Sequence, residues 1–402
     1  MAQERIVAAT PKLGVALVAG VLIALVVGLV GGIIWYNFQK SSTLAVDTAQ
    51  RLLQKSADAA EQRIAVFYEP VIAIVALGSR VPEITGMNPG NASERLDMVM
   101  TGLRRYPQLF SLYVGFDDGS FDMVTRIGGA ERSSARKALG APENAVFAHE
   151  VIRVDAAGKR TASWTFLDEH GATVGQRPDS ETGYDPRQRQ WFHLAKTDEM
   201  VHRSDPYIFA SSQEIGITLS RALEGGSGGV FGADLAVQDV SRFLSENKVT
   251  DSSIAFLFND RGEVIAYPDD SKINRTVTNQ AESTVAPTTI ASLGRPELTA
   301  LYEAVHSGRQ QSMLSLKAGG REYLVEAIPV LRQFGETSYL GMVAPVDEIT
   351  APIDRIRSQA MFYSIAILLL ILPLYVTLVF VWIERRLGRQ SEFFIVRRDA
   401  ED

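Results

Sequence analysis

The chain has 402 residues, of which 46% are hydrophobic, and a formal net charge of −7. This acidic balance argues against a nucleic-acid-binding protein. Because there is no cysteine and the 5 histidines lack metal-ligand spacing, the sequence predicts no disulfide, metal site or bound cofactor. It also holds no P-loop and no credible catalytic set, so we do not expect an enzyme.

The first predicted element is a transmembrane helix. After a short polar tail at 1–12, residues 13–36 contain no charged side chain and exceed the ~20 residues that span a bilayer. A cleavable signal peptide is the alternative, but its apolar core should be only about 7–15 residues long. Small residues recur at every fourth position, which favours dimerisation or close helix packing but also reflects their abundance in membrane helices: Ala16, Gly20, Ala24, Gly28 and Gly32.

Residues 37–105 predict a long helix followed by a helical connection. Apolar residues keep helical spacing from Phe38 to Leu77, with charged residues between them. Pro70 is expected to kink this helix and Gly78 to end it. Asn91 then predicts the N-cap of a second helix.

Residues 106–250 and 251–350 predict two β-rich modules. Helices are expected from near Ser241 and over Glu297–His306, and Asn274–Pro287 is expected to be a surface loop. Asp, Asn and Gly between alternating strands are hairpin signals, and they lie at Asp117–Gly119, Asp168–Gly171, Asn259–Gly262 and Gly319–Gly320. Each module is therefore predicted to be an antiparallel sheet with flanking helices.

A second transmembrane helix is predicted at 361–383, after a connector at 351–360, with a kink at Pro373. Arginines gather in the tail at 384–402. Because basic residues favour the cytoplasmic side of a membrane, both tails are expected inside the cell and 37–360 in the periplasm, as in a multi-pass protein of the bacterial inner membrane. The C-terminal tail is too short for an output domain, so we expect a separate cytoplasmic signalling partner or a truncated receptor.

The segments Tyr184–Phe192 and Pro206–Ser220 carry the chemistry on which the functional prediction rests. Arg189 offers a planar set of N–H donors that matches a carboxylate, and the nearby Trp191 and tyrosines would exclude water around it. A turn at Asp185 predicts an irregular segment that enters a strand. We therefore predict a small-molecule pocket on a sheet.

This pattern is similar to the double-Cache (dCache) sensor domains of bacterial transmembrane receptors. The family's motifs D-P-R-x-R-x-W-[YF], P-Y, T-x-S and G-x-D-[LI] match Asp185–Phe192, Pro206–Tyr207, Thr218–Ser220 and Gly232–Leu235. The resemblance implies an α+β fold with a long N-terminal helix, in which two transmembrane helices flank a periplasmic double PAS-like domain. It also implies a homodimer and a ligand site in the first, membrane-distal module.

Within that family, the amino-acid-binding subset is similar at Tyr184, Arg189, Trp191, Tyr207 and Asp234. In that subset the Arg and Trp hold the carboxylate of the ligand, and acidic residues hold its ammonium group. Two positions depart from the subset, because Phe192 stands where it has Tyr and Phe209 stands where it has Asp. These seven residues form the predicted ligand-binding set, in which a carboxylate clamp is retained.

Some of these positions have another structural interpretation. Asp234 either faces the pocket or caps the helix that begins near Val237. For Arg189 the alternative is a structural arginine packed on an aromatic ring. Tyr113 and Asp118 are better explained by their place in a hairpin than by a role in the pocket.

Together these features predict a transmembrane sensor that binds a small carboxylate-bearing ligand, an amino acid or an organic acid, in the periplasm. One alternative is the truncated sensor half of a cyclase or kinase. Another is a membrane-tethered binding protein that hands its ligand to a transporter. A periplasmic enzyme is disfavoured, because the sequence offers no nucleophile with a base.

Overall fold

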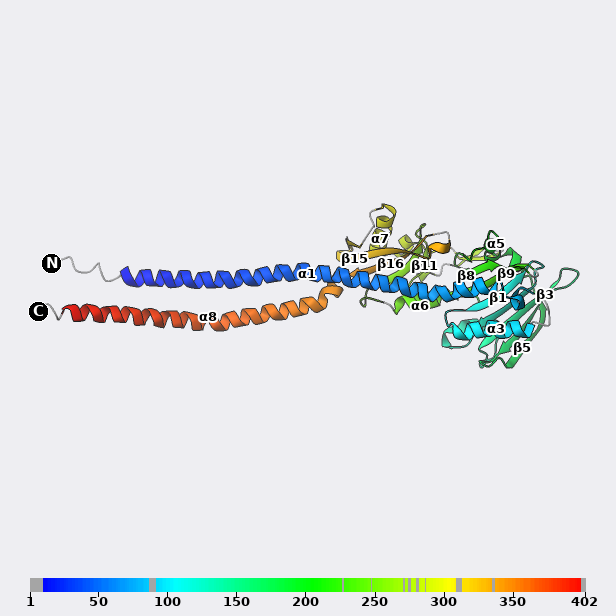
Figure 1. Cartoon of the computed structure of the whole chain (residues 1–402), viewed down its shortest axis with the longest axis horizontal. Helices are drawn as coiled ribbons and strands as arrows, with labels where there is room; N and C mark the ends of the chain where they lie inside the picture. Colours follow the sequence, from blue (N-terminus) through cyan, green and yellow to red (C-terminus); the bar gives the residue numbers. More distant parts are fainter. Residues whose placement is uncertain are drawn as a thin grey trace. The chain divides into compact units, whose positions relative to one another are not determined.

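The computed structural model describes residues 10–86, 92–225, 228–246, 248–269, 272–273, 276–279, 282–285, 287–308, 313–334 and 337–398. Internal contacts divide the chain into two units. One unit combines Met1–Arg51 with Val346–Asp402, and the other is Leu52–Pro345. Figure 1 shows the helices and strands of both units. Asn91, the predicted helix cap, lies outside the described residues.

Two long helices carry the apolar stretches of the sequence. Helix α1 covers Thr10–Gly78 and continues through Pro70 to the predicted end. Helix α8 covers Val346–Arg398, so the predicted connector at 351–360 is helical. Among the described residues, Val346–Trp382 is long enough to cross a membrane and contains an 18-residue stretch with a mean hydropathy of 2.7, whereas Ile23–Tyr36 is a shorter apolar stretch. The predicted span at 361–383 thus lies within a helix of sufficient length and apolarity, and that either stretch crosses a membrane stays a prediction.

The first module of Leu52–Pro345 is built on a nine-stranded antiparallel sheet in the order β5-β4-β3-β2-β1-β9-β8-β6, with β7 paired to β8. The β1–β2 and β4–β5 connections turn at the predicted Asp-Gly sites, where Gly119 and Gly171 have φ of 90°. The strands are β1 Ser111–Phe116, β2 Phe121–Arg126, β3 Phe147–Val154, β4 Arg160–Leu167, β5 Thr173–Glu181, β6 His202–Arg203, β7 Tyr207–Ile208, β8 Ile215–Ala222 and β9 Gly229–Ala236.

Short helices and one apolar core complete this module. Figure 1 shows α5 beside the part of the sheet that contains β8 and β9. The core is rich in aromatic rings from β1, β2, β4 and α5, among them Tyr113, Phe121, Trp164 and Trp191. The helices are α2 Pro82–Thr85, α3 Ala92–Arg105, η2 Ala130–Arg132, α4 Ser133–Leu139, η3 Pro186–Gln188, α5 Gln190–Ala195 and α6 Val237–Ser245.

The second module contains a five-stranded antiparallel sheet in the order β11-β10-β16-β15-β14. The predicted turns at Asn259–Gly262 and Gly319–Gly320 join β10 to β11 and β14 to β15. The elements are β10 Ile254–Asn259, β11 Val264–Ala266, η5 Ile290–Leu293, α7 Pro296–His306, β14 Leu314–Ala318, β15 Arg321–Val330, η6 Arg332–Phe334 and β16 Ser338–Pro345. The fold is therefore α+β with two antiparallel sheets and a long N-terminal helix.

The segment Asn274–Pro287 was predicted as a loop, and this prediction is wrong. Its described residues form a hairpin of β12, Thr276–Asn279, and β13, Glu282–Val285, paired to each other. Both strands contain β-branched Thr and Val, which favour extended backbone. The many Asn, Thr and Ser residues misled the prediction because they are common both in loops and in exposed two-stranded ribbons.

Candidate functional site

Arg189 and Trp191 are positioned by a helical turn anchored at Asp185. The carboxylate of Asp185 accepts the backbone N–H of Arg187 at 3.1 Å, which caps η3. It also pairs with the guanidinium groups of Arg160 at 2.5 Å and of Arg187 at 2.9 Å. This buried, charge-assisted anchor fixes the start of α5, where Arg189 is the N-cap residue. Arg187 therefore serves the loop, and it is not among the residues that line the cavity described next.

Six of the seven predicted ligand-binding residues line one cavity of about 390 Å³ in the first module: Tyr184, Arg189, Trp191, Tyr207, Phe209 and Asp234. Phe192 is not among the lining residues. It is buried, with its ring centroid 5.6 Å from that of Trp191. Successive helical side chains point about 100° apart, and in α5 Trp191 faces the cavity while Phe192 packs into the core.

Trp191 lines the cavity and is 1% exposed. Its ring contacts Tyr113 edge to face, with the centroids 4.9 Å apart. Gly115 in β1 makes room for it, since a Cβ at this position would lie 2.9 Å from Cη2 of the indole. A small residue in one element thus admits the large aromatic of another.

Asp234 is tied into a buried hydrogen-bond cluster. Its Oδ1 accepts the Tyr113 hydroxyl at 2.7 Å and the Thr218 hydroxyl at 2.6 Å. The Tyr207 hydroxyl lies 2.7 Å from the Thr218 oxygen. Asp234 does not cap α6, because the N-cap residue is Ala236. Of the two interpretations of Asp234, the cavity-facing one describes its position, and Tyr113 proves to be a lining residue as well.

Burial and nearby charges shape the electrostatics of the cavity. Burial raises the pKa of Asp234 to about 7, although hydrogen bonds from Thr218 and Tyr113 and the charge of Arg189 oppose this rise. Burial also raises the pKa values of Tyr184 and Tyr207, so both hydroxyls stay neutral donors. The Arg189 guanidinium lies 5.5 Å from the Tyr207 ring centroid and 5.9 Å from that of Tyr184, within cation–π range.

A second carboxyl group, Glu150, was missed by the sequence analysis. It lines the same cavity from β3, and burial raises its pKa to about 8 against the opposing charge of Arg177. Side chains alternate along a strand, and Glu150 shares its face with the buried Ala148 and Ile152. An acidic residue on the apolar face of an alternating strand was the available signal.

The cavity thus combines a cationic group, two buried carboxyl groups and neutral phenol donors within aromatic walls. Such a lining suits a small dipolar or anionic molecule. Among the described residues no cluster of His, Cys, Asp and Glu is arranged to hold a metal ion.

No protein-family model matches the chain. In sequence it is 23% identical over 351 residues to Adenylate cyclase 1 of Rhizobium meliloti, covering 86% of this chain and 51% of the cyclase. It is 25% identical over 219 residues to the methyl-accepting chemotaxis protein PctB of Pseudomonas aeruginosa, covering 53% of this chain and 32% of PctB. The chain therefore spans about half of the first relative and a third of the second.

Among solved structures, the ligand-binding domain of the Pseudomonas fluorescens chemoreceptor CtaA in complex with L-serine is 16% identical, with a TM-score of 0.45 and coverage of 75% of this chain and 99% of that domain. The ligand-binding domain of the Campylobacter jejuni chemoreceptor Tlp3 in complex with L-valine is 12% identical, with a TM-score of 0.46 and coverage of 78% and 98%.

The chain thus has the two-sheet α+β architecture described above, and it resembles parts of bacterial transmembrane signalling proteins in sequence. It is related at low identity to an adenylate cyclase and to methyl-accepting chemotaxis proteins.

Proposed function

We propose that the chain is a transmembrane signal-transduction sensor that binds a small carboxylate-bearing ligand, an amino acid or an organic acid, in the cavity at Arg189. The observation that carries this proposal is the presence of Arg189 and Asp234 in one cavity walled by Tyr184, Trp191 and Tyr207. A guanidinium in an aromatic, water-poor setting binds a carboxylate strongly. The acidic groups then offer a place for an ammonium group.

The proposed setting is the inner membrane of a bacterium, with 37–360 in the periplasm. It is supported by the apolar helical segment Val346–Trp382, by the uncharged stretch at 13–36 and by the arginines that follow residue 383. In this proposal the protein acts as a homodimer. Its output comes from a separate cytoplasmic partner or from the remainder of a longer receptor.

The ligand is accommodated by a change between two arrangements of the module. A ligand shifts such an equilibrium only through its different affinities for the two states. Arg189 is only half-buried, whereas Trp191 is fully buried. In this proposal the carboxylate of the ligand therefore draws Arg189, and with it the turn that leads into α5, towards the cavity.

Calorimetric titration of the detergent-solubilised full chain with L-amino acids and small organic acids tests the proposal. We expect at least one to bind, and Arg189→Ala to weaken that binding by about 2–5 kcal/mol, since it removes the charge partner of the carboxylate. Arg153→Ala is the matched control, because Arg153 is an exposed residue of β3. Unchanged affinity in Arg189→Ala would disprove the site.

A further inference from the structure

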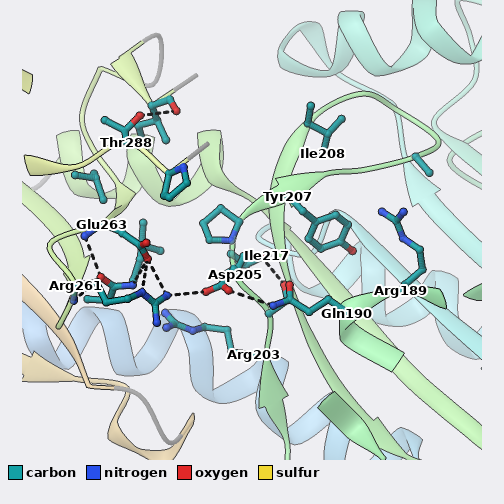
Figure 2. A pocket seen from close by; sticks show the side chains of 18 of the residues that line it. Arg189, Gln190, Arg203, Asp205, Tyr207, Ile208, Ile217, Arg261, Glu263 and Thr288 are labelled. Carbon is teal, nitrogen blue, oxygen red and sulfur yellow. Dashed lines mark hydrogen bonds and ion pairs between the residues drawn. The ribbon is translucent and has the colours of Figure 1, made fainter. Parts of the chain in front are cut away.

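A second cavity, of about 600 Å³, lies between the two modules of Leu52–Pro345. The first module contributes residues around β6 and β7, and the second contributes residues around β10 and β11. Figure 2 shows Arg203 and Asp205 from the first module and Arg261, Glu263 and Thr288 from the second around this space. It borders the first cavity, because Arg189 and Tyr207 line both.

Arg203 is the unusual group in this lining. Its Nε and Nη1 atoms are shielded from solvent and have no hydrogen-bond partner within the described part of the chain. Its guanidinium carbon lies 6.0 Å from the ring centroid of Phe334 in the second module, and in Figure 2 its side chain extends toward Arg261. A guanidinium carries five N–H donors and stays charged in proteins. Shielding its donors from water without an acceptor is unfavourable.

The acidic groups of the cavity are directed at other partners. Glu263 pairs with Arg261 at 2.8 Å. Asp205 lies 3.5 Å from Arg261 and accepts the side-chain amide of Gln190 at 3.2 Å. Neither acid forms an ion pair with Arg203 in the described residues. Within the described part of the chain, the positive charge of Arg203 therefore has no ion pair with a carboxylate of this cavity.

The Tyr68 hydroxyl does not compensate this charge either. The Tyr68 hydroxyl, on α1, is also buried without a hydrogen-bond partner among the described residues. Burial raises the pKa of Tyr68 to about 12 even though the charge of Arg203 opposes the rise. The phenol therefore stays neutral and cannot neutralise the guanidinium.

We propose that the space between the modules is a second binding site, which takes a small oxyanion, a phosphate, sulfate or carboxylate group, with Arg203 as its charged donor. Oxyanions match guanidinium donors in geometry and charge, and the cavity has room for a metabolite larger than the inorganic ion. A guest held by Arg203 touches both modules at once. This proposal is independent of the ligand assigned to Arg189.

Thermal unfolding of the full chain in detergent tests the second site. Sodium phosphate, sodium sulfate and sodium malonate are titrated at constant ionic strength, with chloride as the balancing anion. At least one of the three is expected to raise the unfolding temperature saturably. Arg203→Gln should weaken the apparent affinity about tenfold or more, since it removes the charge-assisted hydrogen bonds. Comparison of the phosphate titration with the malonate titration shows whether the site prefers a phosphoryl or a carboxylate group.

Arg153→Gln, which removes an exposed charge, should behave like the unmodified chain. Arg203→Lys keeps the charge but not the planar set of donors and should retain part of the affinity; it also replaces Arg203→Gln if that variant does not fold. The proposal is overturned if none of the three anions stabilises the chain saturably. It is also overturned if the titrations of the Arg203 variants coincide with that of the unmodified chain.

Discussion

Asp234 keeps a carboxyl group buried and hydrogen-bonded rather than hydrated, and this makes stability depend on pH. Its pKa rises from an ordinary value of 3.8 to about 7 on folding. The folded state therefore holds the proton more tightly than the unfolded state. The contribution to stability is full below the unfolded pKa and is lost as the pH rises through the folded pKa.

We expect the free energy of unfolding to fall between about pH 4 and pH 7 from this contribution, and Asp234→Asn to make the decrease shallower. Urea unfolding of the full chain at a series of pH values measures both slopes. Glu150, whose pKa rises to about 8, acts in the same direction and accounts for the slope that remains. Identical slopes in the unmodified chain and in Asp234→Asn would contradict the raised pKa of Asp234.

The same two carboxyl groups distinguish the two ligand classes in the proposed function. An ammonium-bearing ligand prefers ionised Asp234 and Glu150, so its affinity should rise between about pH 6 and pH 8. A plain carboxylate prefers the protonated groups, so its affinity should fall over the same interval. Calorimetric titration at a series of pH values compares an amino acid with its deaminated counterpart. If the affinities of both ligands change in the same direction with pH, the ligand does not lie beside Asp234 and Glu150.

At the residue scale, the sequence predicted the local part of the site better than its distant part. Arg189 and Trp191 lie in one short motif, so their chemistry could be recognised together. Tyr113 and Glu150 come from β1 and β3, and only strand pairing brings them to the cavity. Their contribution depends on which strands pair, and this pairing joins positions far apart in the sequence that no short motif contains.

At the scale of elements, the β1–β9 pair fixes the geometry of the site. Tyr113 in β1 stands opposite Gly232 in β9, and a Cβ at Gly232 would lie 2.3 Å from the Tyr113 ring. The glycine thus allows the phenol to lie across the neighbouring strand and reach Asp234. The close contact with the Tyr113 ring thus explains why a glycine is needed at position 232.

We therefore expect Gly232→Ala to cost about 1–3 kcal/mol of stability, as overpacking does in cores, and to weaken ligand binding because Tyr113 is displaced. Gly183→Ala is the matched control, since a Cβ at Gly183 meets nothing within 4 Å. Urea unfolding and ligand titration of both variants make the comparison. Equal changes in stability and ligand affinity for Gly232→Ala and Gly183→Ala would show that the contact between Gly232 and Tyr113 has no special role.

Long elements were predicted well and the ribbon at β12–β13 was not. Helix α1 ends at Gly78, as the glycine indicated. The ribbon gains its order from pairing between two short strands, which polar composition conceals. Composition therefore predicts continuous apolar elements more reliably than short exposed pairs.

At the scale of the whole molecule, the membrane topology is the main prediction still to be tested. If residues 13–36 also cross the bilayer, a chain lacking 361–402 should remain in the membrane fraction after carbonate extraction. A chain lacking both segments should be released. Release of the chain that lacks only 361–402 would show that the N-terminal stretch does not anchor the protein.

The shared border of the two cavities has a consequence for the proposed binding of two different solutes. Arg189 and Tyr207 each present atoms to both spaces, so a guest that orders them on one side alters what the other side can accept. By thermodynamic reciprocity, two guests change each other's affinity by the same factor. If both proposed sites are occupied, a solute bound between the modules would change the concentration at which a ligand fills the cavity at Arg189, although the two molecules do not touch.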